Sequence, residues 1–432
     1  MEKGNKKVIN AWAFYDWANS VYPLVITSTI FPIYYENITK TETSDIVTFL
    51  GFQFKNTALY TYSLSFAFLL IAVLSPILSG IADYGGIKKR FMQFFCYMGA
   101  ISCSAMYFFT AENLWLGILL IILASIGYSG SIVFYNAFLP EIAAQKDQDK
   151  VSAKGFALGY FGSSLLLIFN LTLILMPQCY GGISKDIASR TSFLITGIWW
   201  FIFAQYPFYY LPNNIHKRKS EGNLLFKGYK ELKKVWEDLK HNKTLTRYLT
   251  AFFVYNMGVQ TVMLVAVLFG TKEIGMESGE LITTILIIQF IAIGGAYLFS
   301  HFAQKKGNIK SLQFATLIWV LICIMAYFVQ TATHFYFLAL AVGLVMGGIQ
   351  SVSRSTYSKM LPETIDHASY FSFYDICEKL GIVMGMALFG MIEELSDNMR
   401  NPVITLMIFF LVGFILLFRI PKENMIHEAT NG

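Results

Sequence analysis

The stretch Leu116-Gly117-Ile118-Leu119-Leu120-Ile121-Ile122-Leu123 decides the fold class of this chain. Its apolar residues follow one another without interruption, and the apolar character continues from residue 114 to residue 138. A run of about 20 such residues is long enough for a helix to cross the hydrocarbon core of a bilayer. A membrane-spanning strand would instead alternate apolar and polar residues. The stretch therefore predicts a transmembrane helix.

Comparable runs recur along all 432 residues, of which 55% are hydrophobic and 14% are charged. A soluble domain carries about 25% charged residues, so composition also indicates a membrane protein. The sequence predicts an all-α membrane protein with twelve transmembrane helices in two parallel six-helix repeats. The expected spans are residues 12–36, 57–82, 91–110, 114–138, 154–177, 191–211, 248–270, 280–301, 311–330, 334–358, 368–392 and 402–419.

The longest internal polar stretch, residues 212–247, is rich in lysine and arginine and separates spans six and seven. We expect an N-terminal six-helix bundle at residues 1–211, a cytoplasmic basic linker at 212–247 and a C-terminal six-helix bundle at 248–432. Apolar residues recur at helical spacing in the linker, with lysines between them. This pattern predicts an amphipathic helix on the anionic inner leaflet. The apolar positions are Leu225, Tyr229, Leu232, Trp236 and Leu239.

The two halves resemble one another, which indicates an internal duplication. Residues 135–141 (YNAFLPE) recur as residues 357–363 (YSKMLPE). Residues 14–16 (FYD) have a weaker counterpart at 254–256 (VYN). An even number of spans separates the copies, so both halves should have the same orientation. Parallel repeats of this kind are typical of two-bundle transporters, in which the substrate binds between the halves near the bilayer midplane.

The net charge of +6 reports topology rather than an anionic partner. If the N-terminus is cytoplasmic, most of the 33 lysines and arginines fall in inward loops and tails, as the positive-inside rule requires. We therefore expect a multi-pass protein of the plasma (inner) membrane, with both termini in the cytoplasm and no nucleic-acid partner. The five cysteines form no CxxC pair and the six histidines form no H-E-x-x-H pair, so we expect no cofactor and no metal.

Between spans two and three, residues 79–90 (SGIADYGGIKKR) are similar to a loop signature of the major facilitator superfamily, Gly-x-Leu-Ala-Asp-Arg-x-Gly-Arg-Lys-x. Asp83, Gly86 and Lys88 match this signature, whereas two basic positions are replaced. Glycine permits a tight turn between helices, and a carboxylate at the end of span two can face the positive N-terminus of a neighbouring helix.

Charges elsewhere in the loops complete the same pattern. The lysines of the first loop can pair with Glu141 at the end of span four, and the second half repeats the arrangement at Glu363, opposite Lys305, Lys306 and Lys310. We interpret Asp83, Lys88, Glu141 and Glu363 as parts of conformational latches rather than as substrate contacts.

A narrower resemblance rests on four segments. Residues 11–20 (AWAFYDWANS), 134–141 (FYNAFLPE), 347–355 (GGIQSVSRS) and 371–376 (FSFYDI) resemble the vacuole-effluxer-like branch of the superfamily, which is related to autophagy-associated amino-acid exporters. The segments are spread over most of the chain. The resemblance implies twelve spans and export of amino acids or similar small solutes.

Few ionisable residues fall inside the expected spans, and a charge at that depth is a functional-site hypothesis by default. They are Asp16, Arg354, Asp375, Glu378 and Lys379. In a superfamily-like arrangement, spans one, four, seven and ten line the central cavity. The further polar candidates on its walls are Tyr15, Asn19, Tyr128, Tyr255, Asn256, Gln260 and Gln350.

These residues admit three interpretations. Arg354 could hold a substrate carboxylate and Asp16 an ammonium group or a proton, so that a zwitterionic amino acid satisfies both. Asp375 and Lys379 are four residues apart, which favours an ion pair, and Glu378 is expected to point away from them. Asp16, Arg354 and Asp375 are each expected within about two turns of the cytoplasmic end, roughly 10 Å. They could therefore form a cytoplasmic gate, which we favour, or simple helix-packing pairs.

Aromatic and small residues receive structural interpretations. Trp12 and Trp115 lie near span ends, where aromatic belts form. Gly343 and Gly347 are one turn apart, as in small-residue helix contacts. We expect neither group to mark a binding site.

The sequence therefore predicts a secondary active transporter that works by alternating access, and not an enzyme. No G-x-x-x-x-G-K-[ST] nucleotide motif occurs, so the energy source must be a gradient or the substrate itself, and proton coupling through Asp16 or Asp375 is a hypothesis. We expect a monomer in the bilayer with a small-molecule substrate. The alternatives are a lipid or lysolipid flippase of the same fold and, less favoured, an intramembrane enzyme.

Overall fold

The computed structural model describes residues 3–40, 44–214, 224–396 and 398–421, and these residues are nearly all helical. They pack as two compact units. The first unit contains Lys6–Asn136 and Leu158–Gly228, and the second contains Ala137–Ala157 and Tyr229–Gly432, with Glu2–Asn5. The domain boundaries expected from the sequence stay a prediction.

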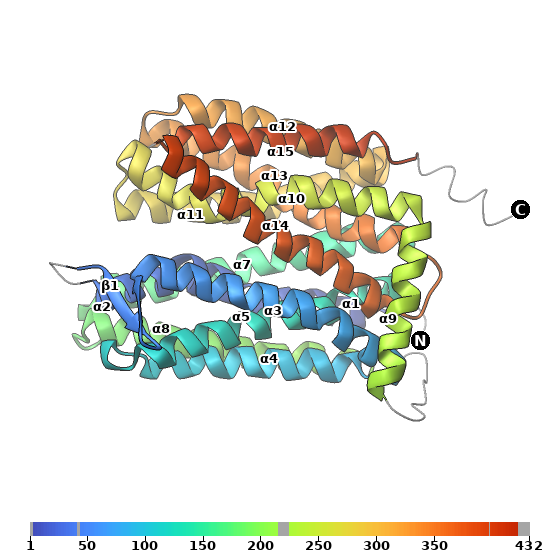
Figure 1. Cartoon of the computed structure of the whole chain (residues 1–432), viewed down its shortest axis with the longest axis horizontal. Coiled ribbons are helices and arrows are strands. Elements are labelled where there is room, and N and C mark those ends of the chain that lie inside the picture. Colours follow the sequence, from blue (N-terminus) through green and yellow to red (C-terminus); the bar gives the residue numbers. More distant parts are fainter. Residues whose placement is uncertain (1–2, 41–43, 215–223, 397, 422–432) are drawn as a thin grey trace, which may run out of the picture. The chain divides into compact units, whose positions relative to one another are not determined.

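The first unit is a bundle of long helices that run alongside one another (Figure 1). Its elements are α1 (Lys6–Asn19), η1 (Tyr22–Ile30), α2 (Phe31–Thr39), β1 (Ile46–Phe49), β2 (Phe52–Lys55), α3 (Asn56–Gly85), α4 (Lys88–Ala105), α5 (Leu114–Asn136), the part of α7 (Gln148–Leu175) from Leu158 on, and α8 (Lys185–Tyr210). Short 3-10 turns occur at η2 (Met106–Phe108), η3 (Ala111–Asn113) and η5 (Pro177–Tyr180).

The first expected span is not one regular helix. After α1 ends at Asn19, the chain continues as the π-helix η1, with Pro23 in its first turn, and then as α2. Proline removes a backbone donor and disturbs the preceding turn. The hydroxyls of Thr27 and Thr29 donate to the carbonyls of Pro23 and Leu24, each at 2.8 Å. Side-chain donors thus satisfy carbonyls where the regular bonding pattern changes.

A β-hairpin follows α2, an element that the all-α expectation did not include. Strands β1 and β2 pair in antiparallel register, with Phe49 opposite Phe52. Two residues, Leu50 and Gly51, make the turn, and both have positive φ values. Positive φ at both central residues is the geometry of the tight hairpin turn that matches strand twist.

The second unit contains the remaining helices. They are α6 (Leu139–Ile142), the first turns of α7, α9 (Leu224–His241) from Tyr229 on, α10 (Lys243–Phe269), α11 (Ser278–Lys306), α12 (Asn308–Phe328), α13 (Ala332–Met360), α14 (His367–Ser396) and α15 (Arg400–Leu417), with η4 (Gln145–Asp147) and the π-turn η6 (Gly270–Ile274). Residues 137–157 follow α5 in the chain, yet they pack with this second unit.

Ten helices of the described residues are long and apolar enough to cross a membrane. Two expected spans are not among them: the first, which is divided into α1, η1 and α2, and the eleventh, α14, whose apolar run is interrupted by Asp375, Glu378 and Lys379. Helices occupy all twelve expected positions, and α7 begins earlier than predicted, at Gln148.

The basic linker forms the amphipathic helix α9. Val235 and Leu239 are buried, whereas Tyr229 and Trp236 of the predicted apolar stripe are exposed and Leu232 is half-buried. The ring of Trp236 stacks on Phe373 of α14 at 5.5 Å. Residues 215–223 of the predicted linker and the side chain of Leu225 lie outside the described part of the chain.

Helices α11 and α13 pack closely because glycines remove side chains at the contact. A Cβ atom at Gly343 would lie 2.6 Å from the carbonyl oxygen of Ile288, and one at Gly347 would overlap the carbonyl oxygen of Ala292. The prediction that these glycines permit close helix contact is confirmed.

We expect Gly347→Ala to destabilise the second unit by about 1–3 kcal/mol, because the added methyl group overpacks this contact. Thermal melting of the purified protein in detergent measures the loss. Gly294→Ala is the matched control. Gly294 lies on α11, and a Cβ atom there would meet no other atom within 4 Å, so this variant should be neutral or slightly stabilising. Equal shifts in both variants would contradict the packing argument.

Candidate functional site

Asp16 is buried in the first unit, where its position on α1 brings it to α5. The hydroxyl of Tyr135 donates a hydrogen bond of 2.8 Å to its Oδ2 atom. A buried carboxylate is costly unless it is hydrogen-bonded, so Tyr135 stabilises the charge at this depth. Tyr135 belongs to the repeated YNAFLPE segment.

Trp12 holds Tyr135 in place. Its indole nitrogen donates to the backbone carbonyl of Tyr135 at 2.8 Å, and the two rings stack with centroids 4.4 Å apart. Tyr15 is also buried, with its ring 5.1 Å from that of Tyr135. The interpretation of Trp12 as an interfacial belt residue is wrong, because its side chain is fully buried.

Asn19 lies one turn further along α1 and is buried. Its Oδ1 atom accepts a long hydrogen bond from Ser20, whereas its Nδ2 group has no partner in the described residues. Helix α7 comes close here because Gly159 leaves room, and a Cβ at that position would lie 2.5 Å from the Ser20 hydroxyl. Asn19 thus carries an unused donor inside the first unit. Tyr128, a further candidate on α5, is half-buried, with its ring 5.7 Å from that of Tyr22.

Arg354 is buried on α13 and is held by the first turns of α7. Its Nε atom donates to the Ser152 hydroxyl at 2.9 Å and its NH2 group to the Ser152 carbonyl at 2.8 Å. The guanidinium also lies 4.1 Å from the ring centroid of Phe156, within range of a cation–π interaction. The fork that could hold a substrate carboxylate is therefore engaged within the protein.

A second charged pair joins the same segment to α13. The Lys359 ammonium lies 2.5 Å from the carboxylate of Asp149, which is fully buried, and Asn308 of α12 donates to that carboxylate at 2.7 Å. The Gln145 amide adds a hydrogen bond of 3.0 Å to the carbonyl of Lys359. Residues 145–152 thus contact α12 and α13 through polar groups.

Glu141 pairs with a residue that the sequence did not indicate. Nδ1 of His367, at the start of α14, lies 2.9 Å from its Oε1 atom, and both side chains are buried. The corresponding Glu363 is exposed. Within the described residues no ion pair joins it to Lys305, Lys306 or Lys310, and the latch interpretation of the second half stays a prediction.

The charged group of α14 is local to that helix. Lys379 lies 3.4 Å from Asp375, as their spacing predicted, and 2.9 Å from Glu378. The expectation that Glu378 points away from Lys379 is wrong. Apart from this ion pair, both carboxylate oxygens of the buried Asp375 lack a hydrogen-bond partner in the described chain.

The remaining candidates of the second unit lie on α10 and α13. The hydroxyl of Tyr255 lies 2.7 Å from that of Ser353. Asn256 is buried with an unpartnered Nδ2 group, among the described residues, and its Oδ1 atom accepts a weak contact from Gln260 at 3.5 Å. Gln350 is half-buried and its Nε2 group contacts the sulfur of Met263 at 3.3 Å.

The loop signature of the first unit forms a tight turn. Gly86 adopts a left-handed conformation and its N–H donates to the carbonyls at the end of α3, while Asp83 and Lys88 are both buried. The neighbouring Lys89 donates to the carbonyl of Leu211 at 2.7 Å. The prediction of a glycine-dependent turn at this position is confirmed.

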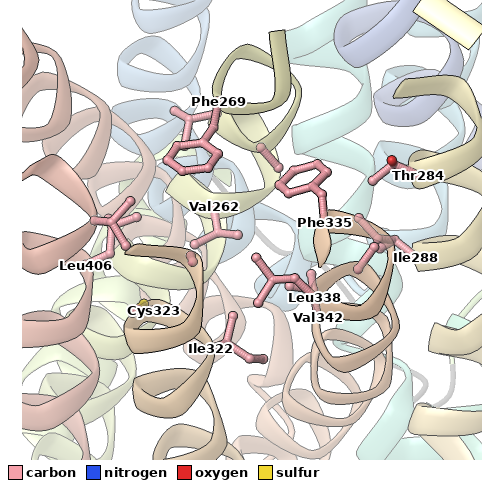
Figure 2. Close-up of a pocket in the computed structure, with 15 residues that line it drawn as sticks. Val262, Phe269, Thr284, Ile288, Ile322, Cys323, Phe335, Leu338, Val342 and Leu406 are labelled. Atoms are coloured by element: carbon pink, nitrogen blue, oxygen red, sulfur yellow. The ribbon is translucent and has the colours of Figure 1, made fainter. Parts of the chain in front are cut away.

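A cavity inside the second unit is almost entirely apolar. Figure 2 shows Phe269, Phe335, Leu338 and other apolar side chains around it. Its one hydroxyl, of Thr284, donates to the carbonyl of Glu280 on its own helix. The cavity therefore offers no group that would recognise a charged solute.

The model of the family described as vacuole effluxer Atg22 like matches residues 4–430. The chain belongs to this family. An MFS-type transporter of Bacillus subtilis (strain 168), YxiO, described as uncharacterized, is 32% identical over 98% of this chain and 97% of its own length. Autophagy-related protein 22 of Kluyveromyces lactis is 25% identical over 98% of this chain and 95% of its own length.

Solved structures show the fold of this Atg22-like chain. The transporter FucP in its outward conformation superposes with a TM-score of 0.72 over 97% of this chain and 99% of its own, at 13% identity. A bacterial homologue of the iron transporter ferroportin superposes with a TM-score of 0.70 over 98% of this chain and 100% of its own, at 9% identity. The Atg22-like protein is a multi-pass membrane protein with the twelve-helix major facilitator fold, and its relatives are transporters.

Sequence reasoning missed the partners of the charged residues in this Atg22-like protein. Ser152 binds Arg354, His367 binds Glu141 and Tyr135 binds Asp16. The pair of Lys359 with Asp149, supported by Asn308, was not predicted at all. Their common signal is position, because they lie within or near the ends of the repeated YNAFLPE and YSKMLPE segments or at the start of an adjoining helix.

Replacing Asp149 with asparagine should destabilise the protein by about 3 kcal/mol, because Lys359 loses its buried counter-charge. Thermal melting in detergent gives the loss. Glu36→Gln, which removes the exposed pair with Lys40, is the matched control and should change stability by less than about 1 kcal/mol. A melting temperature of the Asp149 variant as high as that of the control would contradict the assignment of this pair.

Proposed function

We propose that the protein is a secondary active transporter, and not an enzyme, that exports amino acids or similar small zwitterions by alternating access with proton coupling. Membership of the effluxer family carries the transport part of this proposal. The buried acidic and basic groups of α1, α13 and α14 support the coupling part, because ionisable groups in transporter spans serve as substrate sites and proton relays.

Unused hydrogen-bonding capacity marks the substrate contacts. Asn19 in the first unit and Asn256 in the second each hold a buried amide nitrogen without a partner in the described residues. Buried polar groups are nearly always hydrogen-bonded, so each of these donors, within its own unit, suits a carboxylate of the kind that a zwitterion carries. Arg354 and Asp16 already have partners, which favours a gating role for both.

The gate in this proposal is the contact of residues 145–152 with α12 and α13. Arg354 with Ser152, and Lys359 with Asp149, would separate and reform during each cycle. These contacts are polar and local. Separating them would break hydrogen bonds that can reform with other partners, and it would not expose an apolar core.

Asp375 is our first candidate for the coupling proton and Asp16 the second. Asp375 accepts no hydrogen bond in the described residues, so protonation would cost it the ion pair with Lys379 alone, and Glu378 remains to pair that lysine. Protonation of Asp16 would weaken its hydrogen bond from Tyr135, because a neutral carboxyl accepts less strongly than a carboxylate.

The proposed setting is the plasma (inner) membrane, with both termini in the cytoplasm and a monomer as the working unit. The distribution of lysine and arginine supports this orientation. The flippase alternative would need recognition of lipid rather than of a zwitterion. A thermal-shift screen of the purified protein against amino acids, peptides, polyols and lipids separates the two, and a shift with lipids alone would end the amino-acid proposal.

Proton coupling predicts that an imposed pH gradient drives amino-acid flux in proteoliposomes. Asp375→Asn should abolish the gradient dependence, while exchange of substrate across the membrane without a gradient persists. Asp16→Asn should leave coupling largely intact. If the rate of amino-acid flux through the natural protein does not change with the pH gradient, proton coupling is overturned. The proposed substrate class would be unaffected by that result.

Gating predicts that a link across the contact stops transport. In a cysteine-free background, Gln145→Cys and Lys359→Cys can be joined by a short bis-methanethiosulfonate, which forms a reducible disulfide with each cysteine, because the Gln145 amide lies 3.0 Å from the Lys359 carbonyl. Transport should be lost on cross-linking and return on reduction. Each single-cysteine variant, treated identically, is the control, and full activity of the linked protein would contradict the gate.

A further inference from the structure

The β1–β2 hairpin of the first unit has one wholly apolar face. The register pairs Val47 with Phe54 and Phe49 with Phe52, and side chains two residues apart share a face of a strand. Val47, Phe49, Phe52 and Phe54 therefore lie together. The opposite face carries Thr48, Gln53 and Lys55 with Ile46.

The apolar face is incompletely covered. Phe52 is 69% exposed, and Val47, Phe49 and Phe54 are half-buried. An exposed group of large apolar side chains marks a surface that binds another protein or a membrane. The protein itself covers the face in part, since the ring of Phe54 contacts that of Tyr62 on α3 with centroids 6.4 Å apart.

Tyr62 begins a stripe of exposed apolar residues along α3. Its members recur at helical spacing on one side of the helix: Tyr62, Phe66, Leu69, Val73 and Ile77. On a helix long and apolar enough to cross the membrane, such a stripe faces lipid. Figure 1 shows the hairpin at the end of α3 where the chain enters that helix. The contact of Phe54 with Tyr62 makes the apolar face of the hairpin continuous with this stripe.

The turn of the hairpin gives a second, independent observation. Leu50 has a φ value of 50° and its side chain is 80% exposed. In water this position favours asparagine or glycine, which tolerate the left-handed conformation. A leucine there is strained and gains nothing from hydration, whereas contact with acyl chains would offset the strain.

The root of the hairpin is fixed, so its face has a defined direction. Asn56 is buried, its backbone N–H donates to the carbonyl of Asp45, and its side-chain amide donates to Thr39 at 3.0 Å. The hydroxyl of Tyr35 donates to the carbonyl of Asn56. The first bond closes the root of the hairpin, and the other two tie that root to α2 through Asn56.

We propose that the hairpin is a membrane-inserted element whose apolar face and Leu50 bind the acyl chains of phospholipids at the headgroup boundary. Amphipathic elements bind membranes in this position, with the apolar side buried and the polar side in water. Thr48, Gln53 and Lys55 then face the headgroups and water. This role is independent of the transported solute.

Spin labels on adjacent residues test the proposal. Nitroxides are attached at Phe52→Cys or, as the matched control on the opposite face, at Gln53→Cys, in full-length protein without its native cysteines, reconstituted into phosphatidylcholine–phosphatidylglycerol vesicles. Collisions with oxygen, which concentrates in lipid, are compared with those of a water-soluble nickel chelate. The oxygen-to-nickel ratio should be several-fold higher at position 52 than at 53.

Two other results would overturn the proposal. Equal ratios, high or low, would place both faces in the same environment, so that the hairpin would not present one face to lipid and the other to water. Protection of position 52 from oxygen and nickel together would mean that protein, such as a second copy of the chain, covers the face. Should the cysteine-free protein fail to fold, brominated lipids give the same comparison in the natural background: the quenching that Phe52→Trp adds to that of the seven native tryptophans is compared with the quenching that Gln53→Trp adds.

Leu50→Asn tests the contribution of the turn. Asparagine suits the backbone conformation better but cannot enter the acyl region. In the bilayer it should lower the oxygen-to-nickel ratio at position 52 towards the value at 53. An unchanged ratio would show that Leu50 does not hold the hairpin in lipid.

Discussion

The low dielectric of the membrane interior is the constraint on which the rest of this structure depends. A charge there must be paired or hydrogen-bonded, because desolvation alone costs several kcal/mol per ion. Asp16 therefore fixes α1 against α5 through Tyr135, and Arg354 fixes α13 against the first turns of α7 through Ser152. These few charged residues thus make two helix contacts specific.

The helices could be predicted because their signal is local. Continuous apolar runs such as Leu116–Leu123 specify spans without reference to the rest of the chain, and the ion pair of Asp375 with Lys379 follows from i,i+4 geometry. The orientation of Glu378 did not follow, since adjacent residues point apart on a helix and a long flexible side chain was needed to reach Lys379.

Partners far apart in the sequence could not be predicted in the same way. Tyr135 is 119 residues from Asp16, and Ser152 is 202 residues from Arg354. No periodicity relates such positions, because three-dimensional packing sets them. The repeat could not indicate such partners either: Glu141 and Glu363 occupy equivalent positions in it, but the first is buried against His367 and the second is exposed. The duplication kept the sequence of the segment around each glutamate but not the residues that pack against it.

The first span carries a different kind of information. In η1 the backbone bonds run from each N–H to the carbonyl five residues earlier, as at Phe31 and Ile26, so this segment holds more residues per turn than an α-helix. Asp16 and Asn19 precede the wide turns, and Tyr34 and Tyr35 follow them. Tightening this segment to α-helical bonding would rotate the residues on one side of it relative to those on the other. The first span can therefore rotate its two ends relative to one another by changing its hydrogen-bonding pattern, which a regular helix of the same length could not do.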